Sequence, residues 1–410
     1  MPQELPLLAR QPIFNRTMDV VAYELLYRAD HENRAQFTDG NSASTQVLLN
    51  TFAELSIEKV VGHHRAFINF TAALMETRFP FDTSQLVIEV LESEVINANL
   101  LHHLKRLRED GFSIALDDFV LTKESAALIP YADIIKLDVL ALNDRQLIEH
   151  VNYLKPLGVQ IIAEKIETFA MLEHCRELGC DLFQGYFLEK PQVLKGQRLN
   201  ESKQAVLQLL ARLNDPNAAF EDIETIIARD PVLSYKLLRL VNSAAFALPR
   251  TIESLRQALT LLGLKIIRNW IGLLAMAKLG DKPAELSVKA LTRAKLCELV
   301  ASQTRPHTQC DTFFTAGLLS TLGAFMDAPL PKVLEDIQLS PALRNALLDQ
   351  TGTEGQVLKA VIHYEHGQWQ DIDWAFLAEQ QLDPHTLTAL YLQTLAWVDE
   401  TMLTLHAEAN

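Results

Sequence analysis

Acidic and amide side chains interrupt short apolar segments throughout the first half of this sequence. The acids are Glu24, Glu89, Asp117, Asp118, Asp138, Glu164 and Glu167, and similar segments are interrupted by Asn69, Lys136 and Gln184. Carboxylates that gather in one place raise one another's pKa unless a cation lies between them. Carboxylate and amide oxygens without a histidine or cysteine cluster suit Mg²⁺ or Mn²⁺ better than zinc. If these residues meet, we expect a site for two hard divalent ions.

The spacing of these positions indicates that they do meet. From Asn69 to Gln184, successive positions lie 19 to 28 residues apart, about the length of one strand and one helix. Each therefore falls near the end of its own strand. In a (β/α)8 barrel the carboxyl ends of the strands open on one face, where enzymes of this fold keep their reactive groups. A single such carboxylate is more often a helix cap or surface ion pair, but seven in register favour a shared site.

The segments around these positions have the character of buried strands. Residues 87–90, 113–117, 134–138, 159–164 and 182–186 are short, β-branched or aromatic, and bounded by turn residues. Such segments are typical of parallel strands that are covered on both faces. Between them, residues 99–109 and 171–178 carry apolar side chains at helical spacing. The first half is therefore predicted to be of the α/β class, an N-terminal (β/α)8 TIM-like barrel.

The second half has a different pattern. From residue 199 onward no alternating strand pattern occurs, whereas Asp230 and Pro231 mark a helix start and Gly263 marks a helix end. We predict an all-α region. The change falls in a polar stretch, residues 189–198, whose proline and glycine are rare inside helices and strands. The predicted domains are therefore 1–196 and 197–410.

Composition limits the class of protein. The 410 residues are 49% hydrophobic and 22% charged, which is typical of a globular chain. A net charge of −15 without a local basic patch disfavours direct nucleic-acid binding. No apolar run reaches the roughly 18 residues that a membrane span requires, and no leader sequence is evident. We therefore expect a cytoplasmic protein without a membrane span.

The motifs of the first half resemble the EAL domain of bacterial cyclic di-GMP phosphodiesterases. The family's Gln-Pro-Ile and Glu-Ala-Leu-x-Arg motifs match residues 11–13 and 24–28, with Leu25 in place of alanine. Its later motifs follow in order at Asn69, Glu89 and Glu92, residues 116–119, residues 135–138, residues 163–167 and residues 184–186. The match spans residues 8–192. The whole sequence is similar to the subgroup of this family in which a shortened EAL domain is fused to an HDOD domain.

The resemblance implies a role for each matched position. Two metal ions would be held by Glu24, Asn69, Glu89, Asp117, Asp118 and Glu164. Cyclic di-GMP would contact Gln11, Leu26, Arg28, Asp138 and Gln184. Catalysis to linear pGpG would rest on Glu24, Lys136 and Glu167, while Glu92 would anchor the loop after Asp118. Lys136 would orient or deprotonate the attacking water, and we favour positioning because adjacent carboxylates raise a buried lysine's pKa.

Two departures from the family pattern bear on turnover. Residues 119–125 read Phe-Val-Leu-Thr-Lys-Glu-Ser, where active members have roughly Phe-Gly-Thr-Gly-Tyr-Ser-Ser. We expect strain where β-branched Val120 takes the place of a glycine at positive φ. Lys165 also replaces a glycine, and its ammonium either substitutes for a metal's charge or points outward into solvent.

Three functions are compatible with these departures. We favour slow or partner-dependent hydrolysis, because every metal and lysine position is retained and only a loop that could gate the site has changed. The alternative is a receptor that binds cyclic di-GMP without cleaving it. A scaffold that binds no nucleotide is the third.

The second half resembles the HDOD domain, a relative of the HD hydrolases, in residues 226–243 and 252–264. Where HD hydrolases have a metal-binding His-Asp pair, this sequence has Ser320 and Thr321. Without an imidazole and a carboxylate we expect no catalytic metal there. We predict a non-catalytic module that relays the signal to an unknown signalling protein, and we allow for a homodimer.

Overall fold

The computed structural model describes residues 6–28, 57–76, 82–191, 201–215, 218–243, 246, 252–277, 279, 282–305 and 310–406. The chain divides into two compact units. Unit 1 comprises Met1–Leu188 with Glu365–Gln370, and unit 2 comprises Glu189–Tyr364 with Asp371–Asn410. The predicted boundary after residue 196 lies outside the described residues and stays a prediction.

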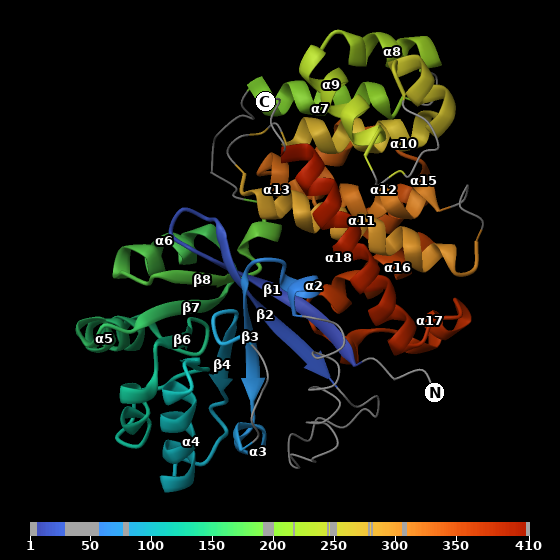
Figure 1. Ribbon diagram of the computed structural model, residues 1–410. Coiled ribbons are helices and arrows are strands. Elements are labelled where there is room, and N and C mark those ends of the chain that lie inside the picture. Colours follow the sequence, from blue (N-terminus) through green and yellow to red (C-terminus); the bar gives the residue numbers. More distant parts are fainter. Residues whose placement is uncertain are drawn as a thin grey trace. The chain divides into compact units, whose positions relative to one another are not determined.

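Eight strands of unit 1 close into a barrel in the order in which they occur along the chain (Figure 1). They are β1 (Leu7–Phe14), β2 (Val20–Arg28), β3 (Arg65–Phe70), β4 (Leu86–Val90), β5 (Ser113–Leu116), β6 (Ile134–Asp138), β7 (Gln160–Ile166) and β8 (Leu182–Gly185). Neighbouring strands from β2 to β8 are parallel. The predicted α/β barrel and its five predicted parallel strands are confirmed.

Helices follow the strands of the barrel. They are α2 (Glu58–Val61), α3 (Ala72–Met75), α4 (Ala98–Glu109), α5 (Asp144–Leu154) and α6 (Phe169–Leu178), with short 3₁₀ turns η1 (Ser125–Ala127), η2 (Ile129–Tyr131), η3 (Lys155–Leu157) and η4 (Phe187–Glu189). In Figure 1, α5 and α6 lie outside strands β6 to β8. Helices α4 and α6 confirm the two predicted helical segments.

Strand β1 departs from the regular repeat, because it runs antiparallel to both β2 and β8. The turn between β1 and β2 is closed by Asn15, whose side-chain oxygen accepts hydrogen bonds from the backbone N–H groups of Thr17 and Asp19, each at 2.9 Å. Asparagine favours such turns because its side chain can bond to the backbone that follows it. The antiparallel pairing places Gln11 directly opposite Glu24.

An apolar layer fills the barrel beneath the polar positions. It consists of Ile13, Ala22, Phe67, Val87, Ala115, Ile134 and Ile162, with Leu182 packed against it. Side chains two residues apart on a strand point to the same face. From β2 to β8, each polar position lies two residues after the layer's residue, as Lys136 follows Ile134. The polar side chains therefore form the next layer, toward the carboxyl ends of the strands.

The described part of unit 2 contains helices and no strand, which confirms the predicted all-α region. The helices are α7 (Glu201–Leu213), α8 (Phe220–Ala228), α9 (Pro231–Val241), α10 (Leu255–Ala277), α11 (Ala284–Ser302), α12 (Asp311–Leu319), α13 (Leu322–Met326), α14 (Leu330–Val333), α15 (Pro341–Leu348), α16 (Gly352–Glu365), α17 (Trp374–Glu379) and α18 (Pro384–His406), with η6 (Leu334–Asp336). The 3₁₀ turn η7 (Trp369–Asp371) begins in the segment that belongs to unit 1. Helix α9 begins as predicted, because the Asp230 side chain accepts a hydrogen bond from the Leu233 N–H at 2.9 Å.

Among the described helices, α10 alone is long and apolar enough to be a candidate membrane span. Length and composition are weak evidence, and 56% of its apolar window is buried inside the protein. The helix is also broken at Gly263, whose φ of 82° and ψ of 162° are not helical. This confirms the predicted helix end at Gly263. Trp270 and Ile271 beyond the break are buried, as in a core helix of a folded domain.

Candidate active site

Lys136 on β6 is the centre of the polar layer. Its Nζ lies 3.1 Å from Glu24 Oε2, 2.9 Å from Glu89 Oε1, 2.7 Å from Asp117 Oδ1 and 3.1 Å from Glu164 Oε2. The lysine side chain is only 1% exposed. Carboxylates from four strand ends thus surround one ammonium group, so the structure brings Glu24, Glu89, Asp117 and Glu164 together as expected.

Burial controls the protonation of this cluster. Burial raises the pKa of Glu89 well above its usual value, and the nearby Glu24 carboxylate raises it further. Burial also raises the pKa of Glu164 to about 8 and raises the pKa of Asp117. Burial alone would lower the pKa of Lys136, but the carboxylates outweigh it and raise this pKa well above its usual value. Lys136 is therefore a charged donor and a poor proton acceptor.

Several buried oxygens beside Lys136 are suited to a hard cation. Among the described atoms, Asn69 Oδ1, Glu89 Oε2 and Glu164 Oε1 are buried and accept no hydrogen bond. A buried polar atom without a partner is unfavourable unless an ion or water satisfies it. Carboxylate and amide oxygens are the ligands that Mg²⁺ and Mn²⁺ prefer. The residues present therefore fit a divalent ion, whose two charges would also offset the excess of carboxylates over ammonium groups.

The positions expected to bind the nucleotide lie next to this cluster. Gln184 Nε2 donates to Gln11 Oε1 at 3.0 Å and to Glu24 Oε2 at 2.5 Å. Leu26 and Arg28 follow Glu24 at two-residue steps on β2 and are partly exposed. The arrangement offers a charged guanidinium and an amide at the rim of the carboxylate cluster.

Lys165 forms a second cluster at the same end of the barrel. Its Nζ lies 2.8 Å and 3.0 Å from the two carboxylate oxygens of Asp118 and 2.8 Å from Asp138 Oδ2. The Lys165 ammonium is therefore paired with carboxylates of the site, although the side chain is 45% exposed. Burial opposes the charge on Lys165, but the two aspartates outweigh it and raise the pKa of this lysine. At Asp138, burial is outweighed by the hydrogen bond from Lys165 and by those from the Leu140 and Ala141 N–H groups, which together lower the pKa of this carboxyl.

The loop after Asp118 avoids the expected strain. Positive φ occurs at Asp118, with φ 42°, and not at Val120. Ser125 closes the loop instead: its Oγ donates to the Val120 carbonyl at 2.7 Å and accepts from the Thr122 N–H at 2.8 Å. The prediction of strain at Val120 is wrong, because the loop turns through Asp118 and a serine-bonded turn that requires no glycine.

Glu92 and Glu167 are both exposed at the edge of the site. Carboxylate oxygens of Glu92, Asp117 and Asp118 lie within 4.8 Å of one another. Glu167 follows the last residue of β7 and is not one of the four carboxylates that contact Lys136. The catalytic role of Glu167 and the anchoring role of Glu92 stay predictions.

Two residues near the site had no place in the sequence analysis. The Tyr27 hydroxyl donates to the Asn69 carbonyl at 2.8 Å, and burial raises the pKa of Tyr27 to about 12. His150 on α5 accepts a hydrogen bond from the Leu121 N–H at 2.9 Å, while its Nδ1 lies 2.7 Å from the Gln146 carbonyl. Because Tyr27 lies inside the Glu24–Arg28 motif, the sequence offered a signal that it lies near the site. A lone histidine on a helix, such as His150, gives no such signal.

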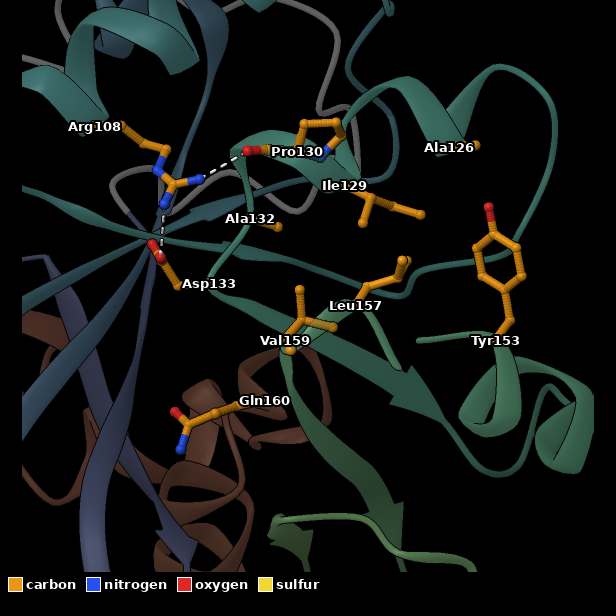
Figure 2. Close-up of a pocket in the computed structure, with 11 residues that line it drawn as sticks. Arg108, Ala126, Ile129, Pro130, Ala132, Asp133, Tyr153, Leu157, Val159 and Gln160 are labelled. Carbon is orange, nitrogen blue, oxygen red and sulfur yellow. Dashed lines mark hydrogen bonds and ion pairs between the residues drawn. The ribbon is translucent and has the colours of Figure 1, made fainter. Parts of the chain in front are cut away.

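A surface pocket lies at the other end of the barrel (Figure 2). Its lining includes Gln160 at the start of β7, Val159 just before it, and Asp133 just before β6. Arg108 donates to the Pro130 carbonyl at 2.7 Å and lies 3.3 Å from Asp133. Because the polar layer lies at the carboxyl ends of these strands, this pocket is separate from the carboxylate site.

Comparisons with known proteins identify the family. The EAL domain model matches residues 7–191, and the HDOD domain model matches residues 199–374. The uncharacterized protein YuxH of Bacillus subtilis is 34% identical over 407 residues, which is 96% of this chain and 98% of YuxH. The chain belongs to the EAL–HDOD family.

A second relative carries a functional name. The cyclic di-GMP phosphodiesterase CdgJ of Vibrio cholerae is 30% identical over 372 residues, or 89% of this chain and 86% of CdgJ. Among solved structures, BlrP1 of Klebsiella pneumoniae with manganese and cyclic di-GMP matches this chain with a TM-score of 0.37 and 22% identity. The match covers 45% of this chain and 56% of the BlrP1 chain.

Proposed function

We propose that this EAL–HDOD protein acts in cyclic di-GMP signalling and that its barrel hydrolyses cyclic di-GMP to linear pGpG with Mg²⁺ or Mn²⁺. The observation that carries the proposal is the Lys136 cluster, in which four carboxylates contact one buried ammonium and neighbouring buried oxygens have no hydrogen-bond partner among the described residues. The similarity to CdgJ over most of the chain supports it.

The metal ligands would be Glu24, Asn69, Glu89, Asp117, Asp118 and Glu164. When bound, the divalent ions would activate a water and neutralise charge on the phosphoryl group. Lys136 fixes the carboxylates by hydrogen bonding and adds positive charge near the scissile phosphate. The water oxygen bonds to phosphorus and gives up a proton, one P–O3′ bond breaks, and the released 3′ oxygen takes up a proton, so that one water is consumed for each bond cleaved.

The rim residues would hold the dinucleotide. The planar guanidinium of Arg28 suits two phosphate oxygens, and an amide such as Gln184 can both donate to and accept from a guanine edge. Gln11 fixes the Gln184 amide by the hydrogen bond described above. We expect Leu26 to contact the ligand through apolar surface, and Asp138 to bind it only when Lys165 moves aside.

A receptor that binds without cleaving is the second candidate, and Lys165 favours it. Its ammonium engages both carboxylate oxygens of Asp118, one of the expected metal ligands. A protein that held cyclic di-GMP but lacked a second ion would retain recognition and lose turnover.

We further propose that the HDOD domain relays the signal to a protein partner without catalysis of its own. At the positions of the His-Asp pair, Ser320 Oγ donates to the Gly317 carbonyl at 2.7 Å and Thr321 Oγ1 donates to the Leu318 carbonyl at 2.8 Å. Each hydroxyl is thus bonded to the backbone carbonyl of the residue three positions before it. Arg293 Nη1 lies 3.3 Å from Ser320 Oγ, so a guanidinium, which cannot ligate a metal, is adjacent.

Binding and turnover measured on one sample test the proposal. Calorimetry with cyclic di-GMP in Ca²⁺, which we expect to suppress cleavage, gives the affinity, and Mn²⁺ is then supplied and pGpG is measured by chromatography. We expect binding and product from the wild type, no product from Glu24→Ala, and weaker binding from Arg28→Ala. Glu109→Ala, at an exposed position of α4, is the matched control and should behave as wild type. Binding without product under Mn²⁺ and Mg²⁺ supports the receptor, and no binding supports a scaffold.

A further inference from the structure

Lys165 reaches the site because the strand is irregular there. In a regular strand, side chains alternate between the two faces, so a residue after Glu164 would face away from it. The pairing of β7 with β8 shifts register between Ala163 and Ile166, and Lys165 itself has φ 58°. This left-handed conformation is unusual for a residue other than glycine. The irregular backbone brings the ammonium of Lys165 to the same end of the barrel as the Glu164 carboxylate.

The partner of Lys165 also has a left-handed backbone. Asp118 has φ 42°, and its two carboxylate oxygens lie within 3.0 Å of Lys165 Nζ. Asp118 belongs to the carboxylate group with Glu92 and Asp117, and Oε1 of buried Glu164 has no hydrogen-bond partner in the part of the chain that the structure describes. A divalent ion at Asp118 would need the same oxygens that Lys165 now occupies.

We propose that Lys165 is a built-in cation that competes with a divalent ion for Asp118, so that the site binds one ion tightly and a second only when the lysine is displaced. This inference rests on the proposed metal-dependent function. The tight ion would use the buried oxygens around Lys136, which Lys165 does not contact among the described interactions.

Exposure makes such a displacement feasible. The Lys165 side chain is 45% exposed, whereas that of Asp118 is 32% exposed and that of Asp138 is 15% exposed. A long lysine stem can swing its ammonium into water at small cost, since exposed ion pairs are weak. The ammonium supplies one charge, and a divalent ion supplies two at a shorter distance from the same oxygens.

Metal-binding stoichiometry measures this competition directly. Mn²⁺ binding to the whole 410-residue chain is measured by equilibrium dialysis and by the electron paramagnetic resonance signal of free Mn²⁺, and it gives one dissociation constant for each ion. We compare wild type with Lys165→Gly and Lys165→Asn, which remove the charge and tolerate positive φ. Lys165→Arg keeps the charge, and Lys105→Gln on α4 removes an exposed lysine elsewhere.

We expect both neutral variants to bind the second Mn²⁺ at least tenfold more tightly than wild type, with the first dissociation constant unchanged. Lys165→Arg and Lys105→Gln should resemble wild type. Equal second-ion affinities in wild type, Lys165→Gly and Lys165→Asn would overturn the proposal. The comparison does not depend on turnover: a protein that binds Mn²⁺ as expected but yields no pGpG contradicts the proposed hydrolysis, and the affinities still decide the role of Lys165.

Discussion

Two lysines lie among carboxylates at the same end of the barrel and differ in burial. Lys136 is 1% exposed and contacts four carboxylates, whereas Lys165 is 45% exposed and contacts two. Removing a buried ion from its partners leaves uncompensated charge, whereas an exposed ammonium can exchange its partners for water. The difference indicates that Lys136 is a fixed part of the site and that Lys165 is replaceable.

The largest expected effect follows from removing the buried lysine. Lys136→Met leaves four carboxylates without their cation, so we expect the free energy of unfolding in EDTA to fall by about 3 to 5 kcal/mol. Lys165→Met should lower it by less than about 1 kcal/mol. Urea unfolding followed by circular dichroism measures both. Equal losses for the two variants would contradict the comparison.

The pH dependence of stability should come from the buried cluster. The pKa of Glu164 is raised from 4.5 to about 8 in the folded protein, so its stabilising contribution is present below pH 4.5 and is lost as the pH rises through about 8. In EDTA we therefore expect the melting temperature to fall between pH 5 and pH 9, by roughly 2 to 4 °C for each kcal/mol of stability lost. Differential scanning calorimetry measures this change.

Two controls sharpen the pH experiment. Glu164→Gln should flatten the dependence, because its side chain does not titrate. Mn²⁺ should raise the melting temperature more at pH 8.5 than at pH 6, because metal binding requires ionised carboxylates. A melting temperature that does not change with pH in EDTA would show that the buried carboxylates stay ionised beside Lys136.

The smallest expected effect concerns the loop after Asp118, the residue that pairs with Lys165. His150→Ala removes the acceptor of the Leu121 N–H, and one such hydrogen bond contributes roughly 0.5 to 1.5 kcal/mol. Hydrogen exchange at Leu121 should therefore accelerate by about 2- to 10-fold. Exchange in α4, measured in the same experiment, should not change. Unchanged protection at Leu121 would show that Ser125 alone holds the loop.

The Lys136 cluster was predictable from sequence because one rule produces it. Each strand alternates its side chains, so an apolar residue followed two positions later by a polar one builds an apolar layer and then a polar layer. The repeated spacing from Asn69 to Gln184 preserves that rule around the barrel. The contact of Lys136 with carboxylates from other strands then follows from closure of the barrel.

The second cluster could not be predicted in the same way. The direction of Lys165 depends on a register shift and a left-handed residue, both of which arise from packing between β7 and β8. The antiparallel course of β1 likewise depends on the turn at Asn15, which the repeat does not encode. At Val120 the family's glycines suggested strain, but Asp118 adopts the positive φ instead.

A single-turnover assay tests the central claim, that the carboxylate site hydrolyses cyclic di-GMP, most directly. Protein in excess over cyclic di-GMP is mixed with Mn²⁺, and the nucleotide is quantified by chromatography over time. We expect complete conversion to pGpG by the wild type and none by Glu24→Ala. Cyclic di-GMP that stays bound and intact in the wild type under both Mn²⁺ and Mg²⁺ would contradict this claim.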